Sequence, residues 1–175
     1  ATRDGYEFIG WFAGDVQITA DTKVDILDDQ TLIADWIKLH EIVFVMEDGE
    51  VVSSGNYKDG ETVTLPTAPE VKGYTFAGWS TGDESFTENF TATCDLTLTA
   101  VYEANEYTVW FDANGGEVAD DSKTVVYDSV YGKLPVATRD GYEFIGWFAD
   151  DVQITADTKV DILDDQTLIA DWIKL

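Results

Sequence analysis

The side chains in this sequence that could do chemistry are mostly carboxylates. The chain has 35 Asp and Glu residues against 10 Lys and Arg, one His and one Cys, and a net charge of −25. Carboxylates can bind Ca²⁺ or act in pairs in glycoside hydrolysis. Asp112-Ala113-Asn114-Gly115-Gly116 resembles the start of a calcium loop, but an EF-hand needs a carboxylate at its twelfth position, where Lys123 stands. The sequence therefore excludes an EF-hand here.

Three acidic clusters leave weaker calcium binding open. They are Asp25-Asp28-Asp29, its copy Asp161-Asp164-Asp165, and Asp120-Asp121. With carbonyl oxygens and water these clusters could hold Ca²⁺, whereas the alternative is an ordinary solvated acidic surface. We predict no metal-binding residues and no cofactor, and leave weak Ca²⁺ binding open.

Nucleophilic catalysis lacks its usual parts. His40 and Cys94 are each single in the sequence, so no nucleophile–base pair recurs along the chain. Carboxylate pairs cannot be judged by counting, but small units offer little concave volume for a substrate cleft. We predict no catalytic residues and no enzyme activity.

The tryptophans have two interpretations. Trp11, Trp79 and Trp147 each follow a glycine in a recurring block, and Trp36 and Trp172 each lie near the end of another block. Such rings could stack on sugars, but a small core also needs large side chains. We predict interior packing for the first three, and core or inter-unit packing for Trp36 and Trp172.

These residues are placed by a tandem repeat. Residues 1–39 recur at 137–175 with one difference, Gly14 against Asp150. A diverged third copy lies between them, because Gly5, Gly73 and Gly141 stand 68 residues apart. We predict the C-terminal part of a repeat over 1–39, a complete repeat over 40–105 and another over 106–175. Near-identical copies are typical of spacers and multivalent binders, since copy number then sets reach or valency.

Alternating apolar residues, rich in Val, Ile, Thr and aromatics, predict strands in every repeat. The predicted strands cover the following residues: Ile42–Met46 or Tyr107–Phe111, Glu61–Leu65 or Lys123–Tyr127, the Gly-Tyr-x-Phe-x-Gly-Trp blocks, and the closing segments Thr31–Trp36, Thr97–Tyr102 and Thr167–Trp172. Asn114-Gly115 favours a tight hairpin, because this pair readily adopts positive φ. Asp21–Leu27 and its copy Asp157–Leu163 are the best helix candidates, capped by Thr19 or Asp21, with one short turn as the upper limit.

The blocks resemble the Listeria–Bacteroides repeat, the B-repeat of internalin-type bacterial surface proteins. The resemblance rests on a set of motifs in the order of that family: Tyr107–Gly116, Leu134-Pro135, Gly141-Tyr142-x-Phe144-x-Gly146-Trp147, and Thr167-Leu168-x-Ala170-x-Trp172. It covers nearly the whole chain. The middle repeat departs from it at Glu47-Asp48-Gly49-Glu50 and at Tyr102, which replaces the closing Trp.

The resemblance implies a mainly β fold of small β-grasp-like units, each a curved mixed sheet with little or no helix. It implies an extracellular, cell-wall-associated array in a bacterial adhesin or internalin-like protein, which spaces and presents other domains. The alternative is a multivalent module that binds a host protein or glycan. The family pattern contains no catalytic residues, and the partner-binding residues stay unknown.

The negative charge and the lack of a long apolar run limit which partners we expect. A strongly negative surface repels nucleic acid and anionic lipid. No signal peptide or apolar run of membrane-spanning length is present. Residues 1–39 lack an opening hairpin, so we expect contacts with neighbouring repeats or another chain to order them.

Overall fold

The computed structural model describes residues 1–175 and consists of strands, turns and loops without a helix. The chain forms two compact units. Residues 1–69 and 77–101 make the first, and residues 70–76 and 102–175 make the second. The sheets contain both parallel and antiparallel pairs. The prediction of a mainly β fold with mixed sheets is confirmed, and the β-grasp-like detail is compatible with this arrangement.

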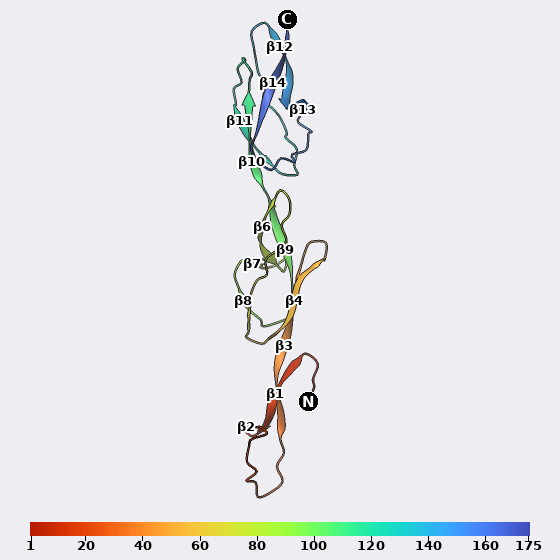
Figure 1. The fold of residues 1–175 in the computed structure, drawn as a ribbon, viewed down its shortest axis with the longest axis vertical. Coiled ribbons are helices and arrows are strands. Elements are labelled where there is room, and N and C mark those ends of the chain that lie inside the picture. The colour runs from red at the N-terminus through yellow and green to blue at the C-terminus, as the bar shows by residue number, and fades with distance from the viewer. The chain divides into compact units, whose positions relative to one another are not determined.

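The second unit contains a five-stranded open sheet. Its strands are β10 (Glu106–Asp112), β11 (Ser122–Val126), β12 (Tyr142–Ala149), β13 (Val152–Ile154) and β14 (Gln166–Lys174). Their order across the sheet is β11-β10-β14-β12-β13 (Figure 1). The opening strand β10 runs parallel to the closing strand β14, and all other neighbours are antiparallel.

The N-terminal and C-terminal halves of this repeat contribute about equally to its core. Alternate residues of β10 point inward, so Val109 and Phe111 are buried and Trp110 between them is not. The buried residues form one cluster: Val109, Phe111, Val125, Tyr131, Ala137, Trp147, Ile154, Val160, Leu168 and Ala170. Residues before 137 and residues after it therefore need each other to exclude water.

A β-bulge in β12 brings its two large rings to the same side. The pairing with β14 shifts between Phe144 and Gly146, which leaves Ile145 as the extra residue. Phe144 and Trp147 then pack edge to face with ring centroids 5.4 Å apart. Gly146 adopts φ 156°, and a Cβ there would lie 2.4 Å from Nε2 of Gln153. Strict alternation would place Phe144 and Trp147 on opposite faces of the sheet. The bulge therefore allows both rings of the motif to pack on the core.

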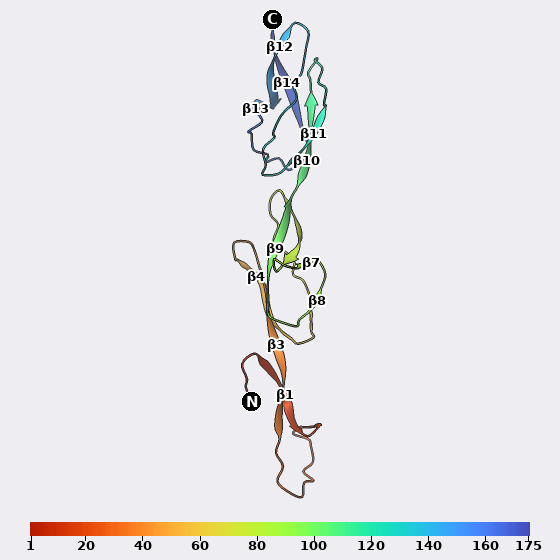
Figure 2. The ribbon, with the colours of Figure 1, turned by 180° about the vertical axis from the view of Figure 1, so that it is seen from behind.

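The first unit repeats this order. The bounds of the remaining strands are β1 (Tyr6–Ala13), β2 (Val16–Ile18), β3 (Ile33–Val45), β4 (Val51–Lys58), β5 (Thr62–Val63), β6 (Tyr74–Ser80), β7 (Ser85–Phe86), β8 (Phe90–Thr91) and β9 (Leu96–Ala104). In the middle repeat the order is β4-β3-β9-β6-β7, with β3 parallel to β9 (Figure 2). The last residues of β9 and the first of β6 belong to the second unit.

Strand β3 serves two repeats. Its first part, from Ile33 to Lys38, pairs with β1 as the closing strand of the N-terminal repeat. Its second part, from Leu39 to Val45, pairs with β4 and β9 as the opening strand of the middle repeat. The two repeats are thus joined by one uninterrupted strand of 13 residues. The boundaries expected at 39/40 and 105/106 stay a prediction.

Two expectations about the hairpins need correction. The expected strand Glu61–Leu65 forms only over Thr62–Val63, which pairs with β8. Its expected place as the second strand of the hairpin is wrong, because the partner of β3 is Val51–Lys58. The missed segment contains Ser53-Ser54-Gly55-Asn56, which has low strand propensity and is held at the sheet edge by backbone pairing. In the last repeat, the expected strand Lys123–Tyr127 matches β11 within one residue.

The turn at Asn114-Gly115 forms as predicted, but it closes no tight hairpin. Asn114 and Gly115 have φ of 46° and 83°, and Gly116 N donates to Ala113 O at 2.9 Å. The chain then pairs Glu117 with Thr138 before it reaches β11. Residues 113–121 therefore form a wide connection between β10 and β11, because the chain first pairs with the segment at Thr138.

The helix candidates Asp21–Leu27 and Asp157–Leu163 are wrong. Each copy has one turn at the start of the segment, with Thr22 N bonded to Thr19 O and Thr158 N to Thr155 O. In the complete repeat the following residues are extended, and Val160 N donates to Ser129 O at 2.8 Å. A β-branched residue with a backbone partner on the neighbouring segment has no reason to form a helix.

The tryptophans of the three Gly-Trp blocks have different environments, although the blocks of Trp11 and Trp147 are identical in sequence. Trp147 is 1% exposed and Trp79 is fully buried, as predicted, whereas Trp11 is 42% exposed. Interior packing is therefore wrong for Trp11 in this structure, because residues 1–39 contain no counterpart of strands β10 and β11, which complete the sheet around Trp147.

This difference predicts unequal costs for the same substitution. Trp147→Ala should lower the unfolding free energy of residues 106–175 by about 3–5 kcal/mol, since it empties a core site. Trp11→Ala, the matched control, should cost about 1 kcal/mol or less. Hydrogen exchange read by segment measures both. Equal losses would contradict the assigned core.

Candidate functional site

The joint between the first two repeats, within the first unit, is centred on His40. This side chain is 1% exposed, and its Nε2 lies 2.8 Å from Oδ1 of Asp59. Its Nδ1 lies 3.6 Å from Oδ1 of Asp95 and has no hydrogen-bond partner. His40 continues the inward alternation of Ile42 and Phe44 in β3, which is the signal that sequence reasoning missed. The lone histidine is therefore a buried packing residue of this joint.

Backbone hydrogen bonds connect the two repeats at this joint. Leu39 N donates to Gly5 O at 2.8 Å, and Asp59 N donates to Lys38 O at 2.9 Å. Lys58 Nζ lies 2.9 Å from Glu7 Oε1. The hydrogen bond with Glu7, and then its charge, raises the pKa of Lys58. The end of one repeat is thereby tied to the first hairpin of the next.

The second unit contains the equivalent joint at Asn105. Asn105 N donates to Gly73 O, as Leu39 N does to Gly5 O, and Tyr127 N donates to Asn105 O, both at 2.9 Å. The side chain adds two bonds: Thr75 Oγ1 donates to Asn105 Oδ1 at 2.6 Å, and Asn105 Nδ2 donates to the Tyr107 hydroxyl at 3.3 Å. Both joints use the same backbone scheme with different side chains.

Aromatic and ionic contacts complete this second joint. The rings of Tyr74 and Tyr127 meet edge to face with centroids 5.5 Å apart, and Lys159 Nζ lies 2.5 Å from Asp128 Oδ1. The hydrogen bond from Lys159 lowers the pKa of the Asp128 carboxyl, and the same bond raises the pKa of Lys159. Desolvation, followed by the charge of Asp128, raises the pKa of the Tyr74 hydroxyl.

The segment that resembles a calcium loop caps a turn instead. Asp112 Oδ1 accepts a hydrogen bond from Asn114 N at 2.8 Å. Asn114 Nδ2 donates to Ala170 O at 3.1 Å, and Ala113 O accepts from Trp172 Nε1 at 3.1 Å. These contacts bind the turn to the closing strand β14.

Gly116 gives the closing tryptophan its place. A Cβ at Gly116 would lie 2.6 Å from Thr138 O and 2.6 Å from Cζ2 of Trp172. Trp172 also packs on Phe144 with ring centroids 5.5 Å apart. Trp36 packs on Phe8 in the same way, at 5.4 Å. The closing tryptophans are half-buried packing residues, as expected.

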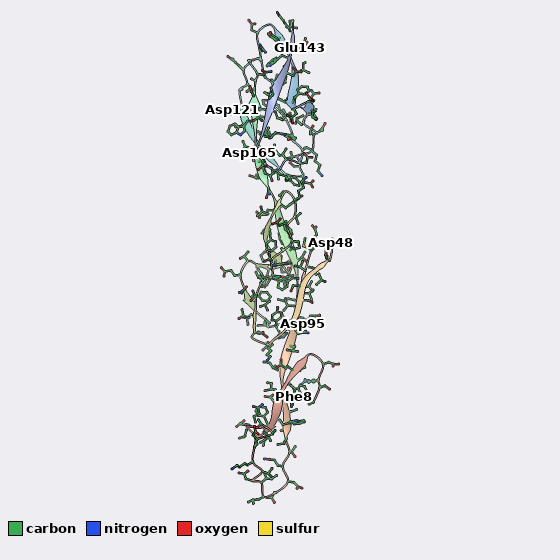
Figure 3. The ribbon with its side chains drawn as sticks, viewed as in Figure 1. Phe8, Asp48, Asp95, Asp121, Glu143 and Asp165 are labelled. Carbon is green, nitrogen blue, oxygen red and sulfur yellow. The ribbon has the colours of Figure 1, made fainter.

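The acidic clusters are divided among separate structural roles. Asp165 Oδ1 accepts from Thr108 N at 2.7 Å, and Asp95 Oδ1 accepts from Glu41 N at 3.0 Å (Figure 3). Each aspartate stands just before a closing strand and accepts from the amide that precedes the first residue of the opening strand in the parallel pairing. Asp121 accepts from the Ser122 hydroxyl at 3.2 Å. No three His, Cys, Asp or Glu side chains come together in an arrangement that could hold a metal ion.

The capping role of Asp165 predicts a result with an internal control. Asp165→Ala should lower the unfolding free energy of residues 106–175 by about 0.5–1.5 kcal/mol, because Thr108 N loses its acceptor. Asp29→Ala changes the equivalent residue within residues 1–39, where no backbone amide donates to the carboxylate, and should have no measurable effect in this chain. Segment-resolved hydrogen exchange in urea compares the two. A loss confined to the Asp29 variant would contradict the capping role.

No helix capable of crossing a membrane occurs in this structure.

Comparison with known proteins identifies relatives over almost the entire chain. The chain is 33% identical over 97% of its length to a protein of Evansella cellulosilytica provisionally named a Gly-rich membrane protein. It is 37% identical over 50% of its length to Internalin H of Listeria monocytogenes. The chain spans 21% of the first relative and 16% of the second.

The Listeria-Bacteroides repeat domain matches residues 40–101 and 107–171. These ranges contain the parallel opening and closing strands, the buried tryptophans Trp79 and Trp147, and the Asn-Gly-Gly turn of the last repeat. The match confirms the resemblance that the motifs indicate. This chain belongs to the Listeria-Bacteroides repeat domain family.

Proposed function

We propose that this chain is a non-enzymatic spacer section of a bacterial surface protein, in which joined repeats hold other domains at a distance. The observation that carries the proposal is the joint at β3, where one strand closes a repeat and opens the next. A joint without a free linker transmits the orientation of one repeat to its neighbour. Repeats of this kind set a reach by their number.

The acidic surface and the relatives support the location. A net charge of −25 keeps neighbouring repeats soluble and disfavours nucleic acid and anionic lipid as partners. Relatives include Internalin H and a protein provisionally named as a membrane protein. We therefore place the parent protein at the bacterial cell surface, as a secreted, wall-associated, adhesin-like protein.

A spacer role predicts a stiff joint that can be tested within the first unit. Cys94 is the single cysteine and is exposed, and Val16 of the N-terminal repeat is 61% exposed. Spin labels on Cys94 and Val16→Cys should give a narrow distance distribution in pulsed EPR. Inserting Gly-Gly-Ser-Gly after Leu39 should broaden it, because the insert interrupts β3.

The matched control carries the same insert after Gly82, in the turn before β7, where φ is 98° and an added Cβ would meet no atom within 4 Å. This variant should keep the narrow distribution. A broad distribution in the uninterrupted chain would contradict the spacer proposal.

An exposed apolar strip supports a second candidate, multivalent binding of a host protein or glycan. Trp110 is 47% exposed on β10, and Ile169 of the neighbouring strand β14 is 46% exposed. Half-exposed aromatic rings bind sugars and protein partners well. The middle repeat has Val43 at the position of Trp110, so the strip differs between repeats.

The binding candidate predicts that Trp110→Ala weakens a partner's apparent affinity by about tenfold or more while stability is unchanged. A glycan array and a pull-down from host-cell extracts, each with this chain and the variant, provide the measurement. Absence of any Trp110-dependent signal at high protein concentration would leave the spacer role alone.

A further inference from the structure

The buried histidine of the first joint lies between two carboxylates. Nε2 of His40 lies 2.8 Å from Oδ1 of Asp59, and Nδ1 lies 3.6 Å from Oδ1 of Asp95. The histidine side chain is 1% exposed, whereas the two aspartate side chains are 60% and 72% exposed. All three residues belong to the middle repeat, which contains both its opening strand β3 and its closing strand β9. The cluster therefore lies wholly within one complete repeat.

One nitrogen of this ring has no hydrogen bond while the ring is neutral. An ionised carboxylate only accepts hydrogen bonds, so the single ring hydrogen lies on Nε2 and is donated to Asp59. Nδ1 of His40 is then a buried acceptor that no donor reaches. A buried polar atom without a partner lowers stability. Uptake of a second proton from solvent makes Nδ1 a donor that faces the carboxylate of Asp95.

Both aspartates are also connected to the backbone at the joint. Asp59 N donates to Lys38 O at 2.9 Å, and Asp95 Oδ1 accepts from Glu41 N at 3.0 Å. The ring of His40 therefore lies between the end of the first hairpin and the start of β9, where β3 passes from one repeat to the next. A change in the charge of this ring acts directly on the contacts of the joint.

The surrounding charges favour proton uptake by this ring. Burial disfavours a charge on His40, but a carboxylate on each side favours it. Near the ring, the adjoining segments carry these other titratable side chains: Lys38 and Glu41 of β3, Tyr57 and Lys58 of β4, and Glu61 in the turn that follows. Lys58 is paired with Glu7, and neither aspartate has an ion pair with a lysine or arginine. The net charge of −25 acts in the same direction.

The second joint has a different residue at this position. Tyr107 occupies the place of His40, because each stands two residues before the start of the parallel pairing. Its hydroxyl accepts a hydrogen bond from Asn105 Nδ2 at 3.3 Å. Tyrosine is neutral throughout the range in which histidine titrates. The chain therefore contains one joint with a titratable ring and one without, which serve as test and control.

We infer that proton uptake by His40 stabilises the first joint, so that this joint opens less often in mild acid than at neutral pH. The inference rests on the proposed spacer role, in which the joints set the orientation of neighbouring repeats. The closed joint offers the proton a second carboxylate contact that an opened joint lacks, so the closed form binds it more strongly. Stability of the joint therefore increases as the pH falls through the range in which histidine titrates, about pH 8 to 5.

Hydrogen exchange by NMR at about pH 7.5 and 5.5 tests the inference on the full chain. Protection of the Leu39 and Asp59 amides, relative to exchange of an unstructured peptide at the same pH, should rise about threefold or more in acid. Protection of the Asn105 and Tyr127 amides at the second joint should change by less than about twofold. The ring signals of the single histidine report its protonation in the same samples.

Three variants make the test specific to the ring. His40→Tyr copies the second joint and should remove the rise while the joint stays folded. Asp95→Asn keeps an acceptor for Glu41 N but removes the charge that faces Nδ1, so it should reduce the rise by about half or more. Asp83→Asn, which changes an exposed carboxylate in the turn before β7, is the matched control and should keep the full rise.

The outcomes separate this inference from the spacer proposal. Equal or lower protection in acid would overturn the inference, as would a rise that persists in the His40→Tyr chain or is unchanged by Asp95→Asn. Strong protection of both joints at both pH values would leave the spacer proposal standing without a role for the proton. Weak protection of both joints at both pH values would contradict the spacer proposal itself.

Discussion

Each repeat depends on the parallel pairing of its opening and closing strands. β3 with β9, and β10 with β14, bring together segments far apart in the sequence, and only then does an apolar core exist. In the last repeat the core residues before and after position 137 are nearly equal in number, so neither half can exclude water alone. Residues 1–39, which contain a closing strand without an opening strand, show the consequence, because Val24 and Leu32 are exposed where Val160 and Leu168 are buried.

The same constraint explains why the repeats are joined so directly. The closing strand lies in the middle of the sheet and must also deliver the chain to the next opening strand. β3 does both in one extended segment, and hydrogen bonds at Gly5–Leu39 and Lys38–Asp59 leave no free linker at that point. At Asn105 the equivalent bonds recur with a side-chain network added. A spacer function needs this kind of joint more than it needs any reactive group.

Several of the many carboxylates have identifiable structural roles in the fold. Asp95 and Asp165 accept from amides at the start of the parallel pairing, Asp112 caps a turn, and Asp59 contacts a buried histidine. A carboxylate that accepts backbone N–H groups satisfies donors that would otherwise be left without a partner.

The sequence by itself determined the repeat, the family, the mainly β class, and the burial of Trp79 and Trp147. Periodicity and spacing carry this information locally, as they do for the positive φ of Asn114 and Gly115. The edge strand Val51–Lys58 and the extended form of Asp157–Leu163 could not be read this way, because backbone partners decide them. The burial of His40 follows the alternation of Ile42 and Phe44, and that signal was missed. Gln30-Thr31-Leu32 and Gln166-Thr167-Leu168 make the distinction plain: the residues are identical, and only the second set forms a strand. Tertiary structure decided that outcome, because a strand exists only where a neighbour accepts its hydrogen bonds and covers its apolar face.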